Sequence, residues 1–69
     1  MEIKVNDKSV VIDENTTMSE LIQELYPENP VGAGIAVAVD GALVPKKEWN
    51  DYIINRPCDV VIIKAAYGG

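Results

Sequence analysis

IAVAVDGALV, residues 35–44, decides the fold of this chain. Residues 35–39 are apolar throughout, which is typical of a strand covered on both faces, or on one face with small alanines on the other. Asp40-Gly41 strongly favours a two-residue hairpin turn, and Pro45 ends the strand that returns from it. The sequence therefore predicts an antiparallel strand pair joined at Asp40-Gly41.

A hairpin and a helix are predicted before this pair. Apolar and charged residues alternate over 2–5, the period of a half-buried strand, and turn-forming residues at 6–8 lead to a returning strand at 9–12. Thr17 and Glu20 have the spacing of a helix capping box. An apolar stripe at helical spacing follows, made of Met18, Leu21, Ile22 and Leu25. We expect one short helix, which Pro27 ends.

The segment after Pro45 is predicted to complete the sheet. Trp49 and Tyr52 stand three residues apart, which favours a helical or 3₁₀ turn that places both rings at the edge of the core. Residues 55–57 read as a turn, and the apolar run 60–63 is typical of a buried strand. Cys58 is interpreted as a small buried hydrophobe, because the chain has no histidine to activate its thiol.

Composition excludes several classes of function. The chain has 69 residues, enough for one small domain, with one cysteine and no histidine. It therefore lacks the commonest general base and metal ligand, and we expect no catalytic residue and no metal site. The net charge is −5, and six acidic but no basic residues lie between Ser9 and Pro45. That charge repels nucleic acid, and it suits either a basic partner or a solvated face.

The N-terminus and the apolar runs point to no membrane or export role. Residues 1–4 do not resemble a signal peptide, and no apolar run approaches the length that spans a membrane. We expect a cytoplasmic protein.

Gly68-Gly69 follows the last predicted strand directly. A diglycine end can enter a slot too narrow for other residues, and its α-carboxylate is an anionic oxygen nucleophile at neutral pH. It could attack a phosphorus of ATP and so become an acyl-adenylate. The alternative interpretation is a frayed end that happens to contain glycine.

The order of these elements is typical of the α+β class, with one main helix packed on a mixed four- to five-stranded sheet. It resembles the ubiquitin-like β-grasp fold, with a domain over residues 1–65 and a flexible tail over 66–69. The alternating Ala-Val run, Asp40-Gly41, Val44-Pro45, Trp49 and the Gly-Gly end together resemble the thiamine-biosynthesis sulfur carrier (ThiS-like) family. The departures from the usual family pattern are Asp40 for Asn, Lys46 for Arg, Cys58 for Gly and Tyr67 for Gln.

This resemblance implies a protein substrate rather than an enzyme. Gly69 would be adenylated by an E1-like adenylating enzyme, which uses ATP, while the carrier itself binds no cofactor. A sulfur-relay protein would then supply the sulfur of a Gly69 thiocarboxylate, and a thiazole synthase would accept it. Gly68, Tyr67 and Ala66 would occupy the partner's slot, and Ile63 and Ala65 would contribute to a docking surface.

Three alternatives stay open on sequence alone. A ubiquitin-like modifier would form an isopeptide bond through Gly69. The small subunit of molybdopterin synthase would end in the same way, although those chains are usually longer. A β-grasp interaction module would carry the Gly-Gly tail without using it.

Overall fold

The computed structural model describes residues 1–29 and 31–65. Its elements in chain order are β1 (Glu2–Val5), β2 (Lys8–Val11), β3 (Thr16–Thr17), α1 (Met18–Leu25), β4 (Ile35–Val39), β5 (Ala42–Val44), the 3₁₀ turn η1 (Lys46–Glu48), β6 (Ile53–Ile54) and β7 (Asp59–Lys64). None of the helices in these ranges is long and apolar enough to cross a membrane.

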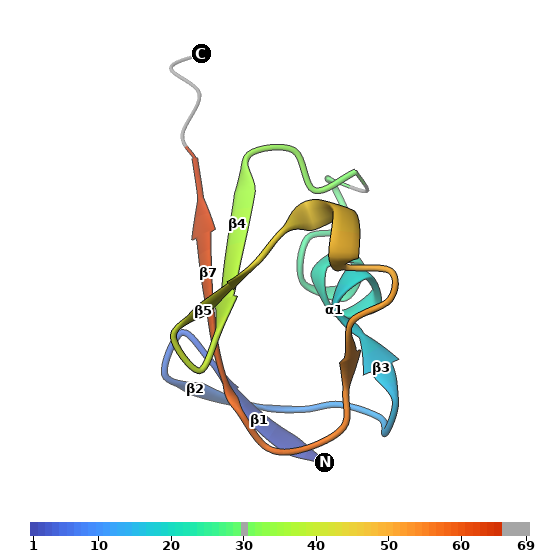
Figure 1. The fold of residues 1–69 in the computed structure, drawn as a ribbon, viewed down its shortest axis with the longest axis vertical. Coiled ribbons are helices and arrows are strands. Elements are labelled where there is room, and N and C mark those ends of the chain that lie inside the picture. Colours follow the sequence, from blue (N-terminus) through green and yellow to red (C-terminus); the bar gives the residue numbers. More distant parts are fainter. Residues whose placement is uncertain (30, 66–69) are drawn as a thin grey trace.

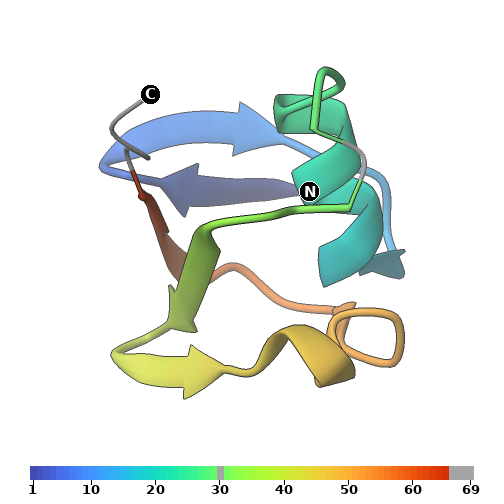
Figure 2. The same ribbon diagram turned by 90° about the horizontal axis from the view of Figure 1, so that it is seen from above.

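The main sheet has five strands in the order β2-β1-β7-β4-β5. β1 and β7 run parallel at its centre, and the remaining neighbours are antiparallel, so the sheet is mixed. α1 packs on one face of this sheet (Figures 1 and 2). The predicted α+β architecture, with one helix on a mixed sheet, is confirmed.

Both predicted hairpins close through two-residue turns. Asn6 and Asp7 have φ of 50° and 68°, and Asp40 and Gly41 have φ of 49° and 86°. Positive φ at both central residues matches the twist of the flanking strands, which is why Asn, Asp and Gly are favoured there. The first turn is shorter than predicted, because Lys8 already pairs with Val5.

The predicted capping box begins α1. The hydroxyl of Thr17 accepts the backbone N–H of Glu20 at 3.1 Å, and the Glu20 carboxylate accepts the backbone N–H of Thr17 at 2.9 Å. That backbone hydrogen bond, and then the Thr17 hydroxyl, lower the pKa of Glu20. Met18, Leu21 and Ile22 are buried, so the apolar stripe faces the sheet as predicted.

Trp49 is a buried residue of the core and packs against Gly32. It is 4% exposed, and its Nε1–H donates to the Val44 carbonyl at 3.1 Å. Its ring lies against Gly32, which has φ of 66°, and a Cβ there would stand 2.6 Å from the ring. The backbone conformation therefore favours glycine at this position, and the Trp49 ring leaves no room for a Cβ.

Two expectations need correction. β3 and β6 form a second, two-stranded sheet that was not predicted, because a strand of two residues has no readable period. The run 60–63 is buried on one face only: Val60 and Ile62 face the core, whereas Val61 and Ile63 are 46% and 64% exposed. A single helix covers a single face of the sheet, so alternate residues of β7 stay in contact with solvent.

Candidate functional site

A strip of apolar side chains lies on the face of the main sheet that α1 leaves uncovered. Strand register builds it, because Ala38 of β4 pairs with Leu43 of β5 on one side and with Val61 of β7 on the other. Ala36 pairs with Ile63 in the next row. We call this set the apolar strip; it consists of Ala36, Ala38, Leu43, Val61, Ile63 and Ala65.

Large side chains dominate the exposed area of the apolar strip. Leu43 is 71% exposed and Ile63 is 64% exposed, while the two alanines between the strands keep the strip flat. Large contiguous apolar patches mark sites where proteins, membranes or ligands bind, so the apolar strip is the candidate docking surface of this chain. The strip follows β7 toward the C-terminus as far as Ala65, the last residue that the structure describes.

The predicted site residues divide into two groups. Ile63 and Ala65 are exposed, and their alternation along the strand places them on the same face. Ala66, Tyr67, Gly68 and Gly69 lie outside the described residues. Sequence reasoning missed Val61, Leu43 and Ala36, because only the pairing of β7 with β4 and of β4 with β5 brings them beside Ile63.

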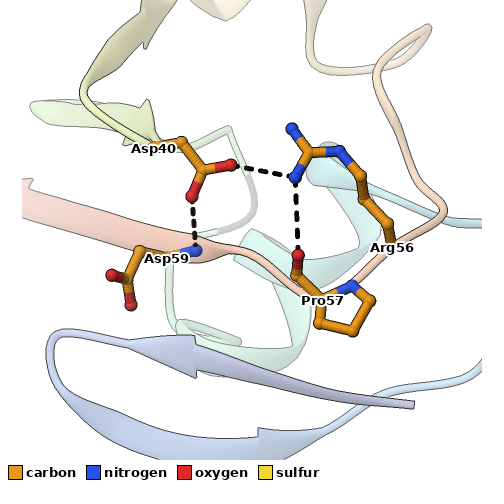
Figure 3. A network of polar contacts seen from close by, with 4 residues as sticks. All are labelled: Asp40, Arg56, Pro57 and Asp59. Carbon is orange, nitrogen blue, oxygen red and sulfur yellow. Dashed lines mark hydrogen bonds and ion pairs between the residues drawn. The ribbon is translucent and has the colours of Figure 1, made fainter.

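A polar network anchors the beginning of β7 (Figure 3). Asp40 in the hairpin turn accepts the backbone N–H of Asp59 at 2.9 Å and donates its own N–H to the Asp59 carbonyl at 2.8 Å. Arg56 pairs with the second carboxylate oxygen of Asp40 at 3.1 Å and also donates to the Pro57 carbonyl. The Asp59 N–H, followed by Arg56, holds the pKa of Asp40 below its usual value.

The other end of β7 is held to the segment that follows α1. Lys64 Nζ lies 3.6 Å from a carboxylate oxygen of Glu28 and 5.1 Å from the ring centroid of Tyr26. The backbone N–H of Ala65 donates to the Gly34 carbonyl at 2.8 Å, which extends the β4–β7 ladder by one residue. Both ends of the strand that leads into the tail are therefore tied to neighbouring elements.

Cys58 and the acidic side chains bear on whether residues 1–29 and 31–65 could hold a reactive thiol or a metal ion. Cys58 is half-buried, and burial, followed by the charge of Asp40, raises the pKa of its thiol and keeps it protonated. Across residues 1–29 and 31–65, no three His, Cys, Asp or Glu side chains come together to hold a metal ion. The feature of the described residues that stands out is the exposed apolar strip along β7.

Comparison with known proteins gives matches over the full length of the chain. The chain is 26% identical to the "Sulfur carrier protein ThiS" of Escherichia coli (strain K12) over 69 residues, covering the whole of both chains. Its fold matches the crystal structure of the thiamine biosynthesis protein (ThiS) from Geobacter metallireducens with a TM-score of 0.78, at 20% identity and complete coverage of both chains. The model of the ThiS family matches residues 1–69. The chain belongs to the ThiS family.

Proposed function

We propose that this chain is a sulfur carrier whose terminal Gly69 is activated as an acyl-adenylate and converted to a thiocarboxylate. The observation that carries the proposal is the family match, which extends over residues 1–69 and therefore includes the Gly-Gly end. The apolar strip also supports the proposal, because it ends at Ala65, four residues before Gly69. A carrier must be recognised by the enzymes that act on its C-terminus, and an exposed apolar surface suits that recognition. Family membership supports a carrier rather than a catalyst.

The chemistry takes place at the main-chain carboxylate. A Gly69 oxygen attacks the α-phosphorus of ATP in the adenylating partner, and pyrophosphate leaves. The terminal sulfur of a persulfide on the relay protein then attacks the acyl carbon and expels AMP. A thiol cleaves the resulting acyl disulfide, so the thiocarboxylate forms while the relay thiols are oxidised to a disulfide.

The carrier contributes shape rather than reactive groups. Gly68, Tyr67 and Ala66 form the segment that enters the partner, with Gly68 as its slender neck, and Ile63 and Ala65 belong to the surface that docks. A thiocarboxylate held on a protein is handed over by surface recognition, so free sulfide does not have to diffuse. The carrier needs no cofactor of its own, and ATP is used by the activating enzyme.

The sulfur acceptor we propose is a thiazole synthase of thiamine biosynthesis. Support comes from the relative in Geobacter metallireducens, whose crystal structure is described as a thiamine biosynthesis protein. Reconstitution with a thiazole synthase tests this acceptor separately from the activation step. Thiocarboxylate formation without transfer to the thiazole synthase would leave the carrier chemistry intact and overturn the acceptor.

Intact-mass spectrometry tests the carrier function directly. The chain is incubated with an E1-like adenylating enzyme, ATP and a persulfide relay, and the expected product is heavier by the exchange of one oxygen for sulfur. A variant lacking Gly68 and Gly69 serves as the control and should remain unmodified. High-mass adducts on lysines would identify a ubiquitin-like modifier instead, and full biological activity of the truncated variant would identify a module with an idle tail.

A further inference from the structure

The two edges of β7 are paired differently along its length. Its odd-numbered residues bond to β4: the Ala65 N–H donates to the Gly34 carbonyl, and the Asp59 carbonyl accepts the N–H of Asp40. Alternate residues of a strand point their backbone groups to opposite sides. The backbone N–H and carbonyl groups of the even-numbered residues therefore point toward β1. In agreement with this, the Val60 carbonyl accepts the Asn6 N–H at 2.9 Å.

Asn6 ends this second ladder with its side chain. β1 ends at Val5, and Asn6 already has the positive φ of the hairpin turn. Its Oδ1 accepts the N–H of Ile62 at 2.8 Å, and its Nδ2 donates to the Ile62 carbonyl at 3.2 Å. The side-chain amide thus replaces one peptide group of a neighbouring strand, at the place where the backbone of β1 has turned away.

Lys64 is the next even-numbered residue of β7. On the side where β1 would lie, its backbone N–H and carbonyl have no partner among the described residues. Its registered neighbour is Ile35 of β4, on the side to which its backbone N–H and carbonyl do not point. On the opposite side no residue of the described ranges pairs with it, and β1 and β2 lie toward the other end of β7 (Figure 1). The Lys64 side chain does not cover this edge, because Glu28 and Tyr26 hold it on the helix side of the sheet.

We infer that the open edge at Lys64 takes an extended strand of the adenylating enzyme, which adds to the main sheet beside β7; this rests on the proposed function. An unpaired N–H and carbonyl on an extended backbone are complemented by another extended backbone. Val61 and Ile63 stand exposed on the adjoining face, where side chains of the added strand can contact them.

Pairing at this edge would set the register of the tail. Gly69 is five residues beyond Lys64, a reach of at most about 18 Å when fully extended. A strand of the enzyme bonded to Lys64 would fix where the last five residues begin. The enzyme could then place the carboxylate of Gly69 next to the ATP that it binds. The outer edge of β2 serves as the internal control. Ile12 exchanges backbone hydrogen bonds with Met1, so Val11 points its backbone groups away from β1, and it lies outside the apolar strip.

Amide hydrogen exchange tests the inference on the intact chain. The ¹⁵N-labelled protein is measured alone and saturated with the unlabelled adenylating enzyme, without ATP. The Lys64 amide should exchange at least about tenfold more slowly in the complex, as one hydrogen bond of about 1.4 kcal/mol requires, while the Val11 amide keeps its rate. An unchanged Lys64 rate in a saturated complex would overturn the added strand.

Proline variants provide a second test. Lys64→Pro removes the outward N–H, and Val11→Pro does the same on the outer edge of β2. Both edges tolerate proline, since neither N–H bonds within the sheet. We expect Lys64→Pro to bind the enzyme about 3- to 10-fold more weakly than Lys64→Ala, while Val11→Pro and Val11→Ala bind it equally well. If the wild-type chain is adenylated and Lys64→Pro binds the enzyme with the same affinity as Lys64→Ala, the inference of an added strand is wrong and the proposed function stands. If the wild-type chain is not adenylated, the proposed function is wrong as well.

Discussion

Truncating Ile63 to alanine should separate partner binding from folding. The change removes three side-chain carbons, each contributing about 0.8 kcal/mol when fully buried. Ile63 is 64% exposed in the free protein, so about 1.5 kcal/mol of that burial is available to a partner that covers the apolar strip. The dissociation constant for the adenylating enzyme should therefore rise about tenfold. The third of the side chain already buried limits the loss of unfolding free energy to about 1 kcal/mol.

Val11→Ala is the matched control for this variant. Val11 is 75% exposed on β2 and pairs with Glu2 at the far edge of the sheet, outside the apolar strip. Calorimetric titration of the wild type and both variants into the adenylating enzyme gives the dissociation constants, and urea unfolding gives the stabilities. Equal affinities of Ile63→Ala and Val11→Ala would refute the assignment of the apolar strip as the docking surface.

Three further predictions concern single positions in the chain. Gly32→Ala should lower the unfolding free energy by about 2–4 kcal/mol in urea titrations, because the new Cβ meets the Trp49 ring and the positive φ is strained; a loss below about 0.5 kcal/mol would contradict this. The pKa of Asp40 is lowered by the Asp59 N–H and by Arg56, so its contribution to stability is present above the unfolded pKa and is lost as pH falls through the folded one. Below about pH 4 the wild type should therefore lose stability more steeply than Asp40→Asn, and parallel pH profiles would count against the network. Gly69→Val should keep the wild-type unfolding midpoint yet abolish adenylation measured by pyrophosphate exchange, and a normal rate would disprove the narrow slot.

The Asp40 network also explains a departure from the usual family sequence. Asparagine could form the same two-residue turn and accept the Asp59 N–H, but it could not form an ion pair with Arg56. Aspartate at this position therefore links three segments, the hairpin turn, the loop before β7 and β7 itself. The link is exposed to solvent, and its effect is to hold the beginning of the strand that leads to the tail.

Local signals in the sequence determined most of the elements. The capping box of Thr17 and Glu20, the Asp40-Gly41 turn and the apolar run 35–39 each depend on residues close together in the chain, and the structure has all three as predicted. The family resemblance is equally a property of the sequence, since it rests on short motifs and the Gly-Gly end.

Only the tertiary structure decided which surfaces those elements present. The apolar strip depends on strand register, and the short β3–β6 sheet depends on Ile54 meeting Thr16. Asn6 reaches Ile62 across 56 positions of sequence and leaves Lys64 as an open edge. A period of two says that the faces of a strand differ, but which face is covered and where a ladder stops are set by contacts between residues far apart in the chain.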